Sequence, residues 1–234
     1  MKVRFSVFFL CVMVILLFSG CYLFAKSDTC YGFNTLDKDI IFLVDTSGSM
    51  EGKNEGNVTD KLRAEAMDRT GDKVGDMIGG KVGGLVSGQM KKESTKLASA
   101  KRELLPAIRG LQATTNFTVI TFSSKVDMWK KNLVPATEKN KSLAMAYVKN
   151  LSASGGTSAM AGLTSSFSLS GADIIFFLSD GHPSDAGADT IIKRVDSLNT
   201  KGKVSIYSIG LGDDKDEAFM KELADKNNGK YVER

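Results

Sequence analysis

The sequence predicts an α/β fold: a doubly wound, Rossmann-like and mainly parallel sheet with helices on both faces. Two features of the pattern support this prediction. Four short runs are apolar almost throughout, which is typical of parallel strands that helices cover on both sides. Between these runs, apolar residues recur every three or four positions, as they do along one face of a helix. Strands that alternate with helices in this way form a parallel sheet. The four runs are residues 40–44, 117–122, 174–178 and 204–209.

The other elements complete a six-stranded sheet. Residues 126–129 follow the second run after a short turn, so we expect one antiparallel edge strand there, and residues 231–233 form the last strand. Asp216 and Gly229 suit the start and the end of the last helix. Pro106 lies inside the first helix and is expected to kink or split it. The helical patterns cover residues 97–111, 143–151, 191–198 and 219–224.

The composition of the 234 residues excludes several classes of protein. Hydrophobic side chains make up 42% and charged ones 25%, with a net charge of +4, so the chain can form a core and is not disordered throughout. The 23 glycines show no three-residue period, which excludes a collagen, and 3 cysteines are too few for a disulfide scaffold. The length suits one α/β domain with additional segments.

The start of the chain has the pattern of an export signal. Lys2 and Arg4 precede residues 5–24, which contain no charged side chain. This is the form of a signal peptide or an N-terminal membrane anchor, and it predicts that the rest of the chain is exported. Residues 18–21 (Phe-Ser-Gly-Cys) resemble a bacterial lipobox, in which Cys21 is lipidated. A lipoprotein, an uncleaved anchor and a cleaved soluble product remain open.

The exported part is not expected to bind nucleic acid. Without Lys2 and Arg4 its net charge falls from +4 to +2. Binding to nucleic acid through charge alone requires a stronger basic excess.

Polar side chains follow two of the predicted central strands where these strands end. Asp45, Ser47 and Ser49 follow the first run, and Asp180 follows the third. In a doubly wound sheet, ligands bind at the carboxyl ends of the strands, close to where the strand order reverses. Oxygen donors without His or Cys suit a hard cation, and a small rigid loop suits Mg²⁺ better than Ca²⁺. The D-x-S-x-S string alone is a weak signal, because such strings usually form turns.

Four segments, taken together and in order, resemble a von Willebrand factor A domain. The resemblance spans about residues 39–233 apart from one insertion, and it implies the fold predicted above. It also implies a metal-ion-dependent adhesion site made by Asp45, Ser47, Ser49, Thr157 and Asp180. The four segments are IIFLVDTSGSM (40–50), SGGTSAMAGL (154–163), FFLSDGHP (176–183) and IYSIGLGD (206–213).

The resemblance implies how this site works. It would hold Mg²⁺, with Mn²⁺ or Ca²⁺ as alternatives, and a protein partner would supply an Asp or Glu to the ion. Thr157 would gate affinity by moving towards or away from the ion, or it would only cap the helix that starts near Ser158. His182 and Gly156 are expected at the rim of the partner-binding surface. No enzymatic activity is expected, because the single histidine has no suitable nucleophile beside it.

An insertion at residues 51–93 separates the D-x-S-x-S string from the first helix. Seven helical glycines would cost about 7 kcal/mol relative to alanine, so no isolated helix would survive. The segment is therefore a helix packed against another helix or a membrane, or else a flexible loop. We expect it to influence the choice of partner. The glycines fall four residues apart in two series, Gly71, Gly75, Gly79 and Gly83, and Gly80, Gly84 and Gly88.

The sequence thus predicts a binding module rather than an enzyme. The leading hypothesis is a module anchored in the bacterial cell envelope, outside the cytoplasm, that binds a protein partner through Mg²⁺. The alternative is an envelope assembly or stress component that acts through oligomerisation or membrane association of the insertion. The predicted parts are residues 1–25 (signal or membrane anchor), 26–38 (short linker) and 39–234 (domain with the insertion 51–93).

Overall fold

The computed structural model describes residues 29–31, 33–52 and 95–234. The predicted export segment with Cys21, and the insertion after Gly52, lie outside the described residues.

The domain is built on a seven-stranded sheet with the order β5-β4-β3-β7-β8-β9, in which β6 also pairs with β4. Parallel pairs join β3 to β4, β3 to β7, β7 to β8 and β8 to β9, whereas β5 and β6 run antiparallel to β4. The predicted doubly wound, mainly parallel sheet is confirmed, with one short strand more than expected. The strands are β3 (Ile40–Asp45), β4 (Asn116–Phe122), β5 (Val126–Met128), β6 (Val134–Pro135), β7 (Ile174–Ser179), β8 (Ser205–Gly210) and β9 (Tyr231–Glu233).

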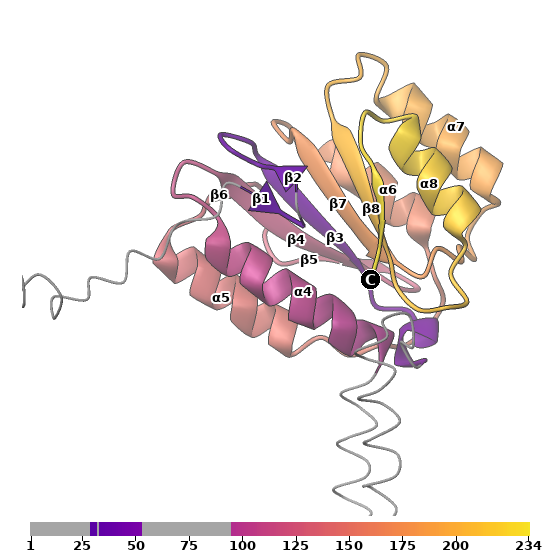
Figure 1. The fold of residues 1–234 in the computed structure, drawn as a ribbon, viewed down its shortest axis with the longest axis horizontal. Coiled ribbons are helices and arrows are strands. Elements are labelled where there is room, and N and C mark those ends of the chain that lie inside the picture. Colours follow the sequence, from indigo (N-terminus) through magenta and orange to yellow (C-terminus); the bar gives the residue numbers. More distant parts are fainter. Residues whose placement is uncertain (1–28, 32, 53–94) are drawn as a thin grey trace, which may run out of the picture.

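Helices cover both faces of this sheet (Figure 1). One face carries α4 and α5, and the other carries α6, α7 and α8. Every residue of β3 and β7 is buried, which explains why these strands are apolar almost throughout. The first helix, α4, continues through Pro106, so the expected split does not occur. The helices are α4 (Lys96–Gly110), α5 (Glu138–Lys149), α6 (Ala159–Ser168), α7 (Ala188–Leu198) and α8 (Glu217–Asp225).

A small hairpin packs on the same face as α4 and α5. Its strands are β1 (Thr29–Cys30) and β2 (Phe33–Asn34), within the segment expected to be a linker. The Phe33 ring stacks on Tyr207 with the ring centroids 4.2 Å apart, and the Tyr31 ring lies 5.0 Å from that of Phe176. These aromatic contacts extend the core on that face.

The topology brings the ends of β3 and β7 to one edge of the sheet. The two strands are parallel neighbours, and Val44 pairs with Leu178. The next residue of β3 is Asp45, and Asp180 follows β7 directly. The two aspartates therefore leave the sheet side by side, at its carboxyl edge beside the short 3-10 helix η1 (Gly48–Glu51).

Candidate metal centre

The predicted ligands come from three loops at the carboxyl edge of the sheet. Asp45, Ser47 and Ser49 lie at the end of β3 and the start of η1, Thr157 precedes α6, and Asp180 follows β7. Asp45, Ser47 and Asp180 are fully buried and Thr157 is nearly so, whereas Ser49 is exposed. The site therefore has a buried acidic floor and an accessible hydroxyl at its rim.

The Asp45 carboxylate has a donor at each of its two oxygens. The backbone N–H of Ser47 donates to Oδ1 at 2.8 Å, and the Ser179 hydroxyl donates to Oδ2 at 2.6 Å. Burial nevertheless dominates and raises the pKa of Asp45 to about 6, with hydrogen bonds opposing the shift and the nearby Asp180 charge adding to it. In the described part of the chain, no basic side chain forms an ion pair with Asp45.

The first loop directs its two serine hydroxyls towards each other. The Oγ atoms of Ser47 and Ser49 are 3.0 Å apart, so either can donate to the other. The N–H of Gly48, between them, donates to the carbonyl of Gly155 at 2.9 Å. The φ angle of Gly155 is 80°, a left-handed conformation that favours glycine. This conformation explains why a glycine stands at position 155. This contact fixes the first loop against the loop that carries Thr157.

Thr157 is held through its backbone by the loop that follows β7. Its N–H donates to the Ser184 hydroxyl at 2.8 Å, and its carbonyl accepts from the N–H of Ser184 at 2.8 Å. The Asp185 carboxylate accepts from the backbone N–H groups of Met160 and Ala161, at 3.3 and 3.1 Å, at the start of α6. The side chain of Asp185, rather than that of Thr157, therefore accepts the backbone N–H groups at the start of this helix.

His182 follows Asp180 by two residues in the loop after β7. It is exposed, its N–H points to Asp180 Oδ1 at 3.4 Å, and its ring Nε2 is hydrogen-bonded to the carbonyl of Asp214. Gly156 is partly exposed on the neighbouring loop, where its N–H donates to the hydroxyl of Ser124 at 2.8 Å.

Sequence reasoning missed Lys96 and Ser179. Lys96 opens α4, and its ammonium contacts Asp180 Oδ2 at 3.2 Å and Asp214 Oδ1 at 2.5 Å. The hydrogen bond from Lys96 is the main reason why the pKa of Asp214 is lowered. Lys96 was not identifiable from the sequence, because a lysine at a helix start is usually exposed. Ser179 had one signal: it directly precedes Asp180 at the end of a buried strand.

These residues fit a divalent cation. Two buried carboxylates leave the sheet side by side, and only Asp180 has a described basic partner. A buried charge without an opposite charge is unfavourable, so the site gains by taking up a cation. Carboxylate and hydroxyl oxygens are the ligands that Mg²⁺ and Mn²⁺ prefer. Among the described residues, no group of three or more His, Cys, Asp or Glu side chains is arranged to hold a metal ion.

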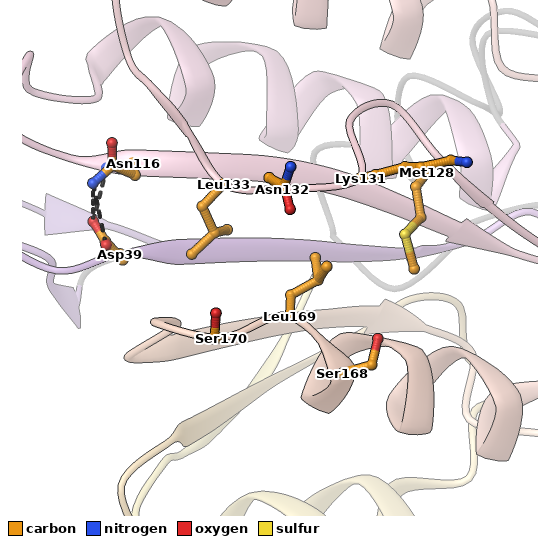
Figure 2. A pocket seen from close by; sticks show the side chains of 9 residues that line it. All are labelled: Asp39, Asn116, Met128, Lys131, Asn132, Leu133, Ser168, Leu169 and Ser170. Atoms are coloured by element: carbon orange, nitrogen blue, oxygen red, sulfur yellow. Dashed lines mark hydrogen bonds between the residues drawn. The ribbon is translucent and has the colours of Figure 1, made fainter.

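A separate cavity of about 710 Å³ lies away from this edge. Asp39, just before β3, contributes to its wall, whereas Asp45 lies at the other end of that strand. Figure 2 shows the Asp39 carboxylate paired with Asn116, whose backbone N–H donates at 2.8 Å and whose side-chain amide donates at 3.0 Å. The remaining wall comes from Met128 and residues 131–133 and 168–170. None of the predicted site residues lines this cavity.

Known proteins are similar to most of this chain. The family described as "von Willebrand factor type A domain" matches residues 86–232. Inter-alpha-trypsin inhibitor heavy chain H1 of Mesocricetus auratus is 30% identical over 208 residues, which cover 83% of this chain and 18% of that protein. The chain thus spans less than a fifth of the length of this relative.

Two solved structures share the fold. The von Willebrand factor type A protein from Catenulispora acidiphila superposes with a TM-score of 0.59 at 17% identity and covers 84% of this chain and 38% of that one. An aerotolerance-related membrane protein from Bacteroides fragilis gives a TM-score of 0.56 at 15% identity, covering 84% and 91% of the two chains. At these identities the likeness concerns the fold.

Proposed function

The chain belongs to the von Willebrand factor type A family, and from that premise we propose that it is an adhesion module which binds a protein partner through a divalent cation. Domains of this family are typically non-catalytic and bind protein ligands. The cation we propose is Mg²⁺, with Mn²⁺ or Ca²⁺ as alternatives. The residues that would hold it are Asp45, Ser47, Ser49, Thr157 and Asp180.

The observation that carries the proposal is the pair of fully buried carboxylates, Asp45 and Asp180, beside two serine hydroxyls 3.0 Å apart. A divalent cation held there supplies a positive position that an Asp or Glu of a partner can ligate. Ser47 orients Asp45 through its N–H, and Ser179 orients it through its hydroxyl. The exposed Ser49 and His182 then lie where an approaching partner would meet the site.

The same contacts argue against a hydrolase. Ser179 donates its hydroxyl to Asp45 and accepts the N–H of Gly181, at 2.6 and 2.9 Å, which is a supporting arrangement for a carboxylate. The His182 ring is hydrogen-bonded to the carbonyl of Asp214, and among the described residues no serine hydroxyl bonds to it. A nucleophile activated by a base requires these two groups to bond each other.

The experiment uses the full chain, solubilised in mild detergent, as bait for partners from an envelope extract in the presence of Mg²⁺. We expect cross-linked capture by the wild type, and loss of that capture in EDTA. The substitutions Asp45→Ala and Asp180→Ala should have the same effect as EDTA. Asp196→Ala is the matched control, because Asp196 is exposed on α7, away from the site. Capture that persists in EDTA and in both site variants would contradict a metal-dependent adhesion site.

We also propose that the module is anchored in the bacterial cell envelope through its N-terminal segment, by lipidation at Cys21 or as an uncleaved anchor. The support is the charge-free run of residues 5–24 after two basic residues. In the described part of the chain, no helix is long and apolar enough to cross a membrane. An unmodified Met1 in the mass spectrum of the mature protein would rule out lipidation at Cys21.

We also propose that the insertion influences the choice of partner. The described residues on either side of it, Gly52 and Lys96, are joined by a hydrogen bond, in which the N–H of Lys96 donates to the carbonyl of Gly52 at 2.9 Å. Lys96 also contacts Asp180, one of the predicted ligands. This contact supports a role for the insertion beside the proposed metal site.

A further inference from the structure

Lys96 is buried at the carboxyl edge of the sheet, beside Asp180, although lysine is among the residues least often buried. Only 2% of its side chain is exposed. It is the first residue of α4, where the helix dipole is unfavourable to a positive charge. Neither helix formation nor solvation favours a lysine at this position. Its charge is therefore stabilised by ion pairs with neighbouring carboxylates.

Two glycines make room for the Lys96 side chain. A Cβ atom at Gly212 would lie 2.5 Å from Lys96 Cε, and one at Gly52 would lie 3.4 Å from the same atom. The backbone N–H of Lys96 is also fixed by the carbonyl of Gly52. Thr95 caps the helix by accepting the N–H of Ala98 at 3.1 Å, which sets the direction in which α4 begins. The surroundings therefore hold the ammonium in one place.

That place is between two carboxylates of different exposure. Asp180 is fully buried and contacts the ammonium at 3.2 Å, whereas Asp214 is 70% exposed and contacts it at 2.5 Å. A cation bound by Asp180 would therefore share that carboxylate with the Lys96 ammonium. A buried aspartate requires an opposite charge nearby, and Lys96 supplies it.

We infer that Lys96 is a resident counter-ion of the metal site, which stabilises Asp180 in the metal-free protein and weakens the binding of divalent cations. This inference rests on the proposed function, and it names a residue that lowers the affinity of the proposed site for divalent cations. Two effects act in the same direction. The positive charge of Lys96 repels an incoming cation, and its ion pair stabilises the state that the cation must replace. Asp214 draws part of the ammonium charge towards solvent and so moderates both effects.

The test compares three variants of the full chain in detergent. Lys96→Met removes the charge and keeps an unbranched side chain. Asp214→Asn removes the exposed partner and leaves the ammonium to Asp180 alone. Lys141→Met is the matched control, because Lys141 is also 2% exposed and pairs with a carboxylate, Glu138 at 3.1 Å, but lies on α5. Binding of Mn²⁺ and of Mg²⁺ is measured by titration calorimetry, and unfolding in EDTA by the fluorescence of Trp129, the single tryptophan.

We expect Lys96→Met to bind Mn²⁺ at least tenfold more tightly than the wild type, which corresponds to about 1.4 kcal/mol. In EDTA the same variant should unfold at a lower temperature, and saturating Mn²⁺ should raise its unfolding temperature more than that of the wild type. Asp214→Asn should bind Mn²⁺ about threefold more weakly, a factor within the range of an exposed ion pair. Lys141→Met should bind as the wild type does.

Each other outcome decides between the inference and the proposed function. Unchanged or weaker Mn²⁺ binding by Lys96→Met, with a wild type that binds, overturns the inference and leaves the proposed function standing. A wild type that takes up no Mn²⁺ contradicts the proposed function; binding by Lys96→Met alone would then still support the inference, and no binding by either overturns both. If Lys96→Met fails to fold even in Mn²⁺, Asp214→Asn decides, because unchanged or tighter binding by that variant overturns the inference.

Discussion

We expect the substitution Asp45→Asn to change how the stability of the metal-free protein depends on pH. The free energy of unfolding of the variant, compared with that of the wild type, should be more favourable at neutral pH than at acidic pH. Asp45 is fully buried, and burial raises its pKa from 3.8 to about 6. Because the folded-state pKa lies above the unfolded value, the folded protein binds more protons between these two values. The stability that Asp45 contributes is therefore fully present below pH 3.8 and is lost as the pH rises through 6.

The magnitude follows from the size of the shift. The shift is about 2 pKa units and each unit corresponds to about 1.4 kcal/mol, so the charged carboxylate lowers the free energy of unfolding by about 3 kcal/mol above pH 6. Part of this change occurs below pH 4.5, which leaves about 2 kcal/mol between pH 4.5 and 7.5. The variant cannot ionise at this position and does not lose that stability. Its amide cannot accept from both Ser47 and Ser179, which costs about 1 kcal/mol at every pH.

The assay is urea unfolding of both proteins in EDTA at pH 4.5, 6 and 7.5, followed by the fluorescence of Trp129. This tryptophan reports on the domain because its ring stacks on Phe117 of β4, with the ring centroids 5.4 Å apart. Ionisable groups that do not interact with Asp45 contribute equally to both proteins, so the difference between the two reports on Asp45 together with its coupling to Asp180. The difference should move by about 2 kcal/mol in favour of the variant between pH 4.5 and 7.5. A pH-independent difference, or a change of opposite sign, would refute the reasoning about Asp45.

Two further predictions concern the loop that carries Thr157 and the helix α6 that follows it. Ser184→Ala removes the hydroxyl that accepts the Thr157 N–H at 2.8 Å, so the free energy of unfolding should fall by about 1 kcal/mol, and the Thr157 amide should exchange its hydrogen faster; unchanged exchange would show that this bond does not hold the loop. Gly162→Ala places a Cβ 3.1 Å from the Phe122 ring, between α6 and β4, and should lower the unfolding free energy by about 1–3 kcal/mol. Gly187→Ala is the control for Gly162→Ala, since no atom lies within 4 Å of the added Cβ, and equal stability of the two variants would contradict tight packing at Gly162.

The central sheet was predictable because its strands need cover on both faces. β3 and β7 are buried along their whole length, and a strand of that kind must be apolar at every position. β6 and the β1–β2 hairpin were not predictable, because strands of two residues are too short to show alternation. β6 also contains Pro135, and a proline is tolerated in a strand only in places such as a short pairing at the edge of a sheet.

The same contrast separates the predicted ligands from the residues that support them. Asp45, Ser47 and Ser49 form a local string, and Asp180 ends a recognisable strand, so the sequence shows all of them directly. Lys96 acts on Asp180 across 84 residues, and Ser179 acts on Asp45 across 134. The Ser179–Asp45 contact depends on the parallel pairing of β3 and β7, and the Lys96–Asp180 contact depends on the packing of the start of α4 at the same edge of the sheet. No local pattern in the sequence encodes either contact.

The two carboxylates at this edge are neutralised in different ways. Asp180 has a fixed counter-ion in Lys96, whereas Asp45 has two hydrogen-bond donors and, among the described residues, no basic partner. Asp45 can therefore lose its charge to a proton near pH 6 or have it compensated by a cation, and these two exclude each other at the carboxylate. A cation that enters the site must displace a proton from Asp45 below pH 6 and must also overcome the ammonium beside Asp180. In the proposed site, these two local charges would therefore act on the affinity for a cation in addition to the hydroxyls of Ser47 and Ser49.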